Sequence, residues 1–402
     1  MKNTGNADGI QLGHKKKDIL IVGAGAIGRG FLPWAIDLEK YHLIFVDINS
    51  KIIDEMNKKG GYSTFRVKNN NLEEKFVTVD QAYYLPEFSK NYYETPQVVF
   101  LAVGPGNVID AAQCLKECLK EKECLEGVKC SIILCENDPK TVKLVRDALN
   151  YDKVYFAVPD VIASNTASEK NLEYDKLAIH TENGSLFVDE RAGFINDGIH
   201  YLTEEELLEC QWTAKLFLHN TSHCVTSYLG ALCGLQYIHE VMMYEDLKSI
   251  VNGTMKEMLV ILKKQSTIES DYLDWYAEKE LSRFAETLLC DPISRVARDP
   301  YRKLELDGRL IGGACMCFSE GKSFDNIMIG IVCASICAYH NTIRLSEIDF
   351  DLSRENILEV FSKIGLEKTN VYDTVISKLD ETITKVKNIK YSFEQQTADI
   401  KK

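Results

Sequence analysis

One stretch of the chain, residues 214–230 (AKLFLHNTSHCVTSYLG), contains a lysine, an asparagine and a histidine at positions 215, 220 and 223. On a helix of about 3.6 residues per turn, this spacing places Lys215, Asn220 and His223 on one side among largely apolar neighbours. Burial disfavours the charged ammonium, so a lysine in such a place loses its proton more easily and can act as general base toward an alcohol.

A second group is needed to stabilise the alkoxide that forms when an alcohol loses its proton, and two asparagines could supply it. Asn220 follows the lysine by five positions, and Asn137 comes at the end of the apolar segment CSIILCEND, residues 130–138. Both amides could donate hydrogen bonds to one oxygen. The same residue types are also common on solvated or structural helices, so spacing alone leaves a structural interpretation open.

A glycine-rich turn near the N-terminus suggests a nucleotide site. Residues 21–31 read IVGAGAIGRGF, with Gly23, Gly25 and Gly28 spaced as G-x-G-x-x-G after a short apolar strand. In a dinucleotide cradle the first glycine permits a tight turn and the second admits the pyrophosphate. The third lets the helix pack closely on the strand.

The residues around this turn indicate which cofactor it would hold. Ala26 and Ile27 would begin the helix whose N-terminus faces the phosphates. A second apolar strand, HLIFVDIN at residues 42–49, contains Asp47, which would accept hydrogen bonds from ribose hydroxyls and repel a 2′-phosphate. Gly104 follows a further apolar strand. We therefore expect NAD in preference to NADP, the alternative being a structural turn that binds no dinucleotide.

A parallel sheet must hold these groups together. Apolar segments alternate with segments of helical composition over the first part of the chain, which predicts a Rossmann-type, doubly wound, mainly parallel sheet. Gly25, Asp47, Gly104 and Asn137 all fall at ends of expected strands, where ligands bind in such sheets.

Two stretches outside that alternation have the pattern of β-hairpins. Residues 61–67 (GYSTFRV) and 74–80 (EKFVTVD) alternate as paired strands would. Residues 176–190 alternate around Asn183-Gly184, a dipeptide typical of tight hairpin turns.

The pattern of residues changes near residue 201, from alternating strands and helices to mainly helical segments. Thr203 and Glu206 have the spacing of a capping box, and the residues that follow favour long helices. We expect a disordered tail over residues 1–15, an NAD-binding Rossmann domain over 16–200 and a mainly α-helical, substrate-binding C-terminal domain over 201–402.

Bulk composition excludes several classes of protein. The chain has 402 residues and a formal net charge of −13, which argues against a nucleic-acid or anionic-membrane surface. No apolar run approaches the length of a membrane span and the N-terminus lacks a secretory signal, so we expect a cytoplasmic protein. The 13 cysteines lack metal-ligand spacing, so we expect reduced thiols and no bound metal.

The motifs together resemble the polyol-specific long-chain dehydrogenase family. The resemblance rests on GAGAIGRGF at 23–31, FVDIN at 45–49, CEN at 135–137, KLFLHNTSHCVTSYLG at 215–230 and RDPYRKLELDGRLI at 298–311. The length of the chain fits the shorter branch of that family, which acts on phosphorylated sugars. The resemblance implies a Rossmann domain followed by a helical domain, no catalytic zinc, and a monomer or small homo-oligomer.

The resemblance also implies roles for the residues named above. Lys215 would be the general base, Asn137 and Asn220 the pair that stabilises the alkoxide, and His223 a residue that positions the substrate. Family members usually carry Val-Asp-Arg after the sixth strand, where this chain has Pro159 and Asp160. Asp160 would then take the substrate-binding role by a shift of one residue, or the role is lost.

A basic cluster is the candidate site for an anionic part of the substrate. Arg298, Arg302, Lys303 and Arg309 lie close together in an otherwise acidic chain. The planar guanidinium of arginine can donate two parallel hydrogen bonds to a phosphate or a carboxylate. The structural alternative is that these residues form a solvated helix end.

The sequence thus predicts an NAD-dependent oxidoreductase that interconverts a sugar alcohol phosphate and its sugar phosphate, of the mannitol 1-phosphate and fructose 6-phosphate type. A hexuronate reductase and a dehydrogenase of non-phosphorylated polyols are alternatives within the enzymes. A nucleotide-sensing protein without turnover is an alternative from another class.

Overall fold

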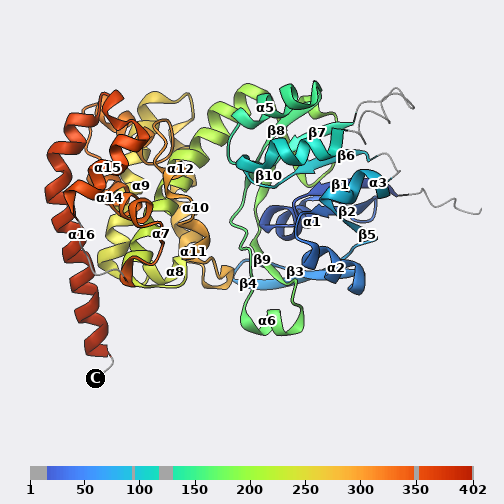
Figure 1. The fold of residues 1–402 in the computed structure, drawn as a ribbon, viewed down its shortest axis with the longest axis horizontal. Helices are drawn as coiled ribbons and strands as arrows, with labels where there is room; N and C mark the ends of the chain where they lie inside the picture. The colour runs from blue at the N-terminus through green and yellow to red at the C-terminus, as the bar shows by residue number, and fades with distance from the viewer. Residues whose placement is uncertain (1–15, 93–95, 117–129, 348–352, 401–402) are drawn as a thin grey trace, which may run out of the picture.

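The computed structural model describes residues 16–92, 96–116, 130–347 and 353–400, which form two lobes (Figure 1). The expected disordered tail, residues 1–15, lies outside the described residues. One lobe is built on a large sheet and the other consists of helices, so the expected fold class is confirmed. A cleft between the two lobes contains the candidate site.

An eight-stranded sheet forms the centre of the first lobe, in the order β11-β10-β8-β7-β6-β1-β2-β5. All pairs are parallel except β8 with β10, which are antiparallel. The strands are β1 (Lys17–Val22), β2 (Tyr41–Asp47), β5 (Gln81–Tyr84), β6 (Val98–Leu101), β7 (Ser131–Leu134), β8 (Val154–Asp160), β10 (Ser185–Asp189) and β11 (Ile199–Leu202).

Helices cover both faces of this sheet because its strands are apolar on both sides. In β1, Ile19 and Ile21 belong to one hydrophobic core and Leu20 and Val22 to the other. The helical segments of this lobe are η1 (Ala26–Phe31), α1 (Leu32–Ala35), α2 (Ser50–Lys59), α3 (Phe88–Asn91), residues 108–116, α5 (Lys140–Leu149) and α6 (Glu169–Tyr174).

A small second sheet, in the order β4-β3-β9, lies beside the large one. Strands β3 (Gly61–Lys68) and β4 (Asn71–Thr78) form the hairpin expected from their alternation. The hairpin expected around Asn183-Gly184 is wrong. Strand β9 (Ile179–Glu182) pairs with β3 in the small sheet, whereas β10 pairs with β8 in the large one. The chain therefore crosses between sheets at Asn183-Gly184. The pattern indicated two strands correctly, the fully buried β9 and the mostly buried β10, but not that they pair with other strands.

The second lobe is a bundle of helices around two that are buried on nearly all sides. These two, α7 (Thr221–Cys233) and α14 (Asp325–His340), pack against each other and against their neighbours. The others are α8 (Ile238–Val241), α9 (Glu245–Gln265), α10 (Ser270–Phe284), α11 (Ile293–Val296), α12 (Pro300–Lys303), α13 (Ile311–Ser319), α15 (Arg354–Ile364) and α16 (Tyr372–Ile400). Helix α16 runs along the outer edge of this lobe (Figure 1).

The segment that connects the lobes is helical, and much of it is π-helix. Thr203 and Glu206 form the expected capping box, in which each backbone N–H donates to the side chain of the other. Two stretches of π-helix follow, η5 (Glu206–Trp212) and η6 (Lys215–Asn220), before α7 begins at residue 221. Stretches of i→i+5 helix are rare in proteins and occur frequently at functional sites.

Candidate active site

The glycine turn after β1 has the geometry that its spacing predicts. Gly23 has a φ of +102°, and a Cβ there would collide with the carbonyl of Ala102. A Cβ on Gly28 would collide with the carbonyl of Gly23, so this glycine lets the following helix pack on the turn. Gly25 has no atom within 4 Å of the position of a Cβ, which leaves room for a phosphate group to approach the backbone.

Asp47 lies at the end of β2 beside this turn. Its Oδ2 accepts a hydrogen bond of 2.6 Å from the backbone N–H of Ala24, and its Oδ1 accepts one of 2.7 Å from Asn49. Each carboxylate oxygen can accept a further hydrogen bond, so the fixed and half-buried Asp47 can still bind ribose hydroxyls. The glycine turn and Asp47 together fit a dinucleotide.

Gly104 follows β6 with a φ of +90° and contributes to a feature that sequence reasoning missed. The backbone N–H groups of Val103 and Gly104 donate to Oε1 of Glu136, at 2.8 and 3.0 Å. Burial raises the pKa of Glu136 to about 7. The glutamate of the segment CEN thus fixes the loop around Gly104, a role that its spacing does not indicate.

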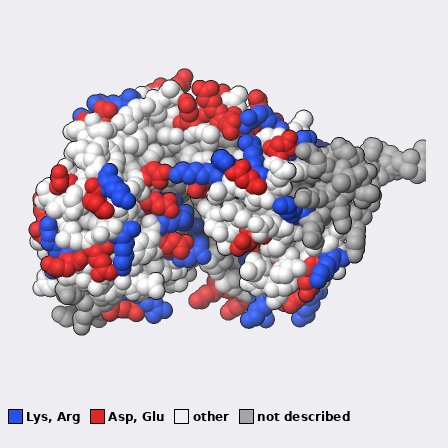
Figure 2. Space-filling view, turned by 45° about the horizontal axis from the view of Figure 1, so that its top comes forward, with Lys and Arg blue, Asp and Glu red and all other residues white. Residues whose placement is uncertain are grey.

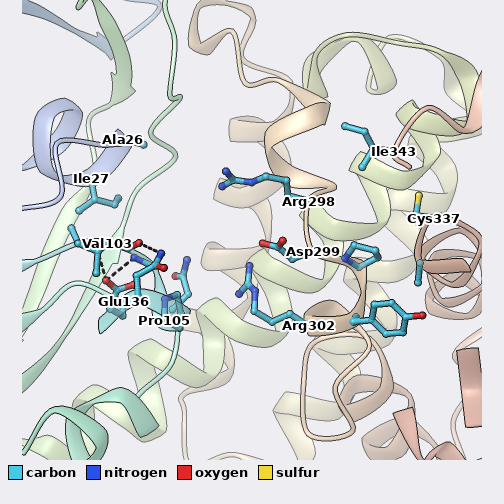
Figure 3. Close-up of a pocket in the computed structure, with 18 of the residues that line it drawn as sticks. Ala26, Ile27, Val103, Pro105, Glu136, Arg298, Asp299, Arg302, Cys337 and Ile343 are labelled. Carbon is cyan, nitrogen blue, oxygen red and sulfur yellow. Dashed lines mark hydrogen bonds between the residues drawn. The ribbon is translucent and has the colours of Figure 1, made fainter. Parts of the chain in front are cut away.

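Two adjoining cavities occupy the cleft between the lobes. The larger, of about 1070 Å³, extends from Gly104 and Glu136 across to Arg298, Arg302 and the turn after α14 (Figure 3). Figure 2 shows the molecule hollowed between its lobes, with Lys and Arg side chains on the wall of the hollow. We call the smaller cavity, of about 170 Å³, the inner chamber. Both cavities are lined by Ala26, Ile27, Cys135, Asn137, Arg298 and Arg302.

The inner chamber brings together residues that lie up to 283 positions apart, from Ala26 to Arg309. Its walls come from the start of η1, the ends of β7 and β8, the π-helix η6 with the first turn of α7, and the segment from α11 to residue 309. Among its lining residues are Asn137, Lys215, Asn220, His223, Arg298, Arg302, Lys303 and Arg309. These are the residues expected to act as catalytic or substrate-binding groups, with the exception of Asp160.

Lys215 is 5% exposed, and its ammonium group donates a hydrogen bond to the backbone carbonyl of Pro159. Burial lowers the pKa of Lys215 to about 8, against the opposing effect of the nearby Asp160 carboxylate. A group with this pKa exchanges protons readily near neutral pH, as a general base requires.

Asn220 carries one of two buried side-chain nitrogens that lack a hydrogen-bond partner among the described residues. An unpartnered N–H group in a buried place is costly, and a ligand oxygen in the chamber could remove that cost. Asn220 ends the same π-helix that Lys215 begins. An i→i+5 helix brings residues five apart closer to one face than an α-helix does, so this local geometry draws the two side chains together.

Asp160, the expected substrate-binding residue, is not among the residues that line the inner chamber. Its carboxylate is buried and accepts hydrogen bonds from Tyr276 (3.2 Å), Lys279 (2.7 Å) and Arg283 (2.9 Å). Although burial raises its pKa, Arg283 and Lys279 hold the pKa of Asp160 below its usual value. The backbone of the preceding residue, Pro159, faces Lys215 instead.

Arg283 is the centre of a buried charged group that sequence reasoning also missed. We call Asp160, Glu182, Glu280 and Arg283 the paired cluster. The guanidinium of Arg283 donates to all three carboxylates, and Glu280 in turn is bonded to His219, which lines the inner chamber. No local pattern could have revealed the cluster, because its members come from β8, β9 and α10.

The arginines of the expected basic cluster contrast with Arg283. We call Arg298, Arg302 and Arg309 the open arginines, because no guanidinium among them has a hydrogen bond or ion pair within the described residues, and only the backbone carbonyls of Arg298 and Arg309 accept side-chain bonds. Arg298 and Arg302 point across the cleft toward the sheet lobe (Figure 3).

Lys303 differs from these arginines although it is their neighbour in sequence. Its ammonium group donates to the backbone carbonyls of Val296 and Arg298, and burial lowers its pKa to about 7. Lys303 thus holds the loop that carries Arg298, whereas the open arginines remain available to an anion.

Two family models match nearly the whole chain. The mannitol dehydrogenase Rossmann domain matches residues 17–193, and the mannitol dehydrogenase C-terminal domain matches residues 209–400. The chain belongs to the mannitol dehydrogenase family.

Curated relatives in the mannitol dehydrogenase family include two bacterial proteins of similar length. The chain is 27% identical to mannitol-1-phosphate 5-dehydrogenase of Thermoanaerobacter pseudethanolicus, over 93% of this chain and 98% of the relative. It is 28% identical to mannitol-1-phosphate 5-dehydrogenase of Clostridium acetobutylicum, over 87% of this chain and 94% of the relative.

Solved structures of the same fold include Pseudomonas fluorescens mannitol 2-dehydrogenase in ternary complex with NAD and D-mannitol. Its TM-score is 0.70 at 13% identity, over 95% of each chain. A substrate-free D-sorbitol dehydrogenase gives a TM-score of 0.68 at 14% identity, over 93% of this chain and 94% of the other. At 13–14% identity, this structural similarity shows that the chains share a fold and nothing further.

The cysteines of this member of the mannitol dehydrogenase family are free thiols wherever the structure describes them. Over the same described ranges, no three His, Cys, Asp or Glu side chains are grouped so that they could hold a metal ion. None of the described helices is both long and apolar enough to cross a membrane.

Proposed function

We propose that the protein is an NAD-dependent dehydrogenase that interconverts a sugar alcohol phosphate and the corresponding sugar phosphate, of the mannitol 1-phosphate and fructose 6-phosphate type. The observation that carries this proposal is the inner chamber. It places a lysine of lowered pKa and an unpartnered asparagine N–H in one small space with the open arginines. The names of the curated relatives support the same substrate class.

The first lobe supplies the residues that would hold the dinucleotide. Gly23, Gly25 and Gly28 form the cradle for its pyrophosphate, and Asp47 would accept hydrogen bonds from the adenosine ribose. The negative charge of Asp47 opposes a 2′-phosphate, which favours NAD over NADP. When bound, the nicotinamide accepts or returns a hydride.

Lys215 is the proposed general base in alcohol oxidation. With a pKa of about 8, part of its side chain is the neutral amine near neutral pH, and Nζ can then take the hydroxyl proton of the substrate. The carbonyl of Pro159 holds Nζ in one place. Asn220 and Asn137 line the same chamber and would donate hydrogen bonds to the developing alkoxide.

The open arginines are the proposed site for the substrate phosphate. They lie on the opposite side of the cleft from the glycine turn, and each has donors to spare. Arginine forks bind phosphate oxygens through paired, charge-assisted hydrogen bonds. A phosphate held there would bring the polyol chain into the inner chamber, next to Lys215.

A hexuronate reductase is the second candidate, because a carboxylate would also satisfy the open arginines. Following NADH absorbance with a panel of substrates separates the two. Mannitol 1-phosphate and fructose 6-phosphate should give the highest kcat/KM, ahead of unphosphorylated mannitol and fructose and of hexuronates. A preference for hexuronates would favour the second candidate, and absence of turnover across the panel would contradict both.

A further inference from the structure

An ion pair between Asp291 and Arg295 lies beside the ring of His223. Nε2 of His223 is 2.9 Å from Oδ2 of Asp291. The other oxygen of that carboxylate, Oδ1, accepts two hydrogen bonds from Arg295, at 2.9 and 2.6 Å. Asp291 is 4% exposed and precedes α11, which carries Arg295. Asp291 thus bonds Nε2 of His223 directly, and Arg295 in turn fixes Asp291.

Aromatic packing holds the ring of His223 as well. It stacks on Phe284 with 5.1 Å between ring centroids and an angle of 9° between the planes. The ring of His219 lies 4.9 Å away at a tilt. With one face covered and one nitrogen bonded, the ring has a single orientation in the inner chamber.

The charges around this pair decide which ring nitrogen carries the proton. Burial raises the pKa of Asp291, but Arg295 and His223 lower it more, so the pKa of Asp291 is about 2 and the group is a carboxylate. Burial also lowers the pKa of His223, so its imidazole is neutral near neutral pH. A carboxylate can only accept hydrogen bonds, so the proton of the neutral ring must reside on Nε2.

The second ring nitrogen of His223, Nδ1, therefore carries no proton and can only accept a hydrogen bond. Nδ1 of His223 makes no hydrogen bond with any described residue, and in a side chain that is 6% exposed it is not among the fully enclosed atoms that lack a partner. His223 lines the inner chamber, and with Nε2 bonded to Asp291, Nδ1 is the ring nitrogen left for a ligand there. The chamber thus offers donors at Asn220 and the open arginines and an acceptor at His223.

We propose that Asp291, held by Arg295, is a positioning residue that fixes His223 as the Nε2–H tautomer, so that Nδ1 accepts a hydrogen bond from a substrate hydroxyl. The second half of this proposal rests on the proposed function, because it assumes that a polyol fills the inner chamber. A pocket built to bond a hydroxyl discriminates strongly against an analogue that lacks it. The Asp291–Arg295 pair would then help to select a polyol with a hydroxyl near the reacting carbon.

The tautomer is tested on the protein alone, without cofactor or substrate. In protein labelled with ¹⁵N at histidine, the nitrogen shifts of His223, assigned by their loss in His223→Gln, should be those of a neutral ring protonated on Nε2. In Asp291→Asn the side-chain amide can also donate, so the Nδ1–H form should become populated. A ring protonated on Nδ1 in the unmodified protein, or an unchanged spectrum in Asp291→Asn, would overturn the proposal even if the proposed function holds.

Kinetics test the acceptor role with the best phosphorylated polyol and its monodeoxy analogues. Asp291→Asn should raise KM about tenfold to a hundredfold with a smaller change in kcat, and Asp291→Glu should recover part of the loss. Removing one particular hydroxyl should weaken binding to the unmodified enzyme and have little effect in Asp291→Asn. Equal losses in both enzymes for every analogue would contradict the acceptor role.

Glu257→Gln is the matched control for these variants. Glu257 is a half-buried carboxylate in the helical lobe that accepts from the backbone N–H groups of Asn326 and Ile327 and lies outside both cavities. Its substitution should leave the His223 spectrum and KM unchanged. An equal rise of KM in Glu257→Gln would show that the effect of Asp291→Asn is a general loss of packing.

Discussion

The paired cluster and the open arginines are two groups of charge in one molecule, and they have opposite arrangements. In the paired cluster, Arg283 is surrounded by three carboxylates and is 7% exposed. The open arginines have no acidic partner in hydrogen-bond contact among the described residues, and they line a cavity. A buried charge such as Arg283 needs a partner, whereas Arg298 is exposed and Arg302 and Arg309 are half-buried, so water can solvate these three until an anion binds.

The paired cluster is therefore expected to contribute to the stability of the fold, and the open arginines to recognition of a ligand. Removing one member of the paired cluster leaves buried charge without compensation, whereas removing an open arginine takes away only groups that a bound anion would use. Lys215 lies between them, since its pKa responds to Asp160 and Arg283 while its amine lines the chamber of the open arginines. Substitutions at each of the three places should therefore change different quantities.

The largest effect is expected at Lys215. Lys215→Ala should lower kcat about 10²- to 10⁴-fold, because the base that takes the alcohol proton is lost. Binding of NADH, followed by its fluorescence, should change little, since the glycine turn is in the other lobe. If Lys215→Ala retains most of its kcat, the base lies elsewhere and His223 becomes the next candidate.

Arg283→Met should destabilise the protein by about 3–5 kcal/mol, because it leaves Glu182, Glu280 and Asp160 buried without their common cation. Urea unfolding measures the loss. Arg309→Met is the control from the open arginines, and it should change the free energy of unfolding by less than about 1 kcal/mol. Equal losses in the two variants would contradict the division between paired and open charges.

Arg302→Met and Arg309→Met should each weaken recognition of a phosphorylated substrate by about 1.5–3 kcal/mol, seen as a rise in KM. The unphosphorylated parent should be affected far less. Lys303→Met gives a matched comparison, because its ammonium is bonded to backbone carbonyls and its loss should affect both substrates alike. If the arginine variants raise KM equally for both substrates, these arginines do not bind the substrate phosphate.

The pH dependence follows from the lowered pKa of Lys215. Alcohol oxidation needs the neutral amine, so its kcat should rise about tenfold per pH unit below pH 8 and level off above it. Reduction of the sugar needs the protonated amine and should fall as the pH rises through the same range. A profile that is flat between pH 6 and 9, or one that survives in Lys215→Ala, would contradict the assignment.

The smallest expected effect concerns the cofactor. The unmodified protein should prefer NAD over NADP by at least about tenfold, or roughly 1.4 kcal/mol, because Asp47 repels a 2′-phosphate. Asp47→Ser should narrow that preference, measured as the ratio of kcat/KM values. Equal efficiency with both cofactors in the unmodified protein would refute the role of Asp47.

Sequence patterns were sufficient for those parts of the molecule that depend on neighbours along the chain. The parallel sheet follows from alternating apolar strands and helices, and the glycine turn from three residues within six positions. The spacing of Lys215, Asn220 and His223 on one helical segment likewise placed them around one cavity.

The rest depends on residues that are distant in sequence. The side chain of Asp160 leaves the strand end toward Arg283, which is 123 positions away. The change of sheet at Asn183-Gly184 looks like a hairpin because alternation reports strands and not their partners. The hydrogen-bond partner of His223, Asp291, likewise follows it by 68 positions, so no local pattern could have indicated the Asp291–Arg295 pair.

The paired cluster also limits how freely the two halves of such a protein can be exchanged during evolution. Asp160 and Glu182 lie within the Rossmann match, residues 17–193, whereas Glu280 and Arg283 lie within the C-terminal match, residues 209–400. A chimaera joined between those matches would inherit Arg283 from one parent and two of its three carboxylates from the other. Recombination at that junction should therefore succeed only between parents that share the whole set, and the two halves are expected to have diverged together.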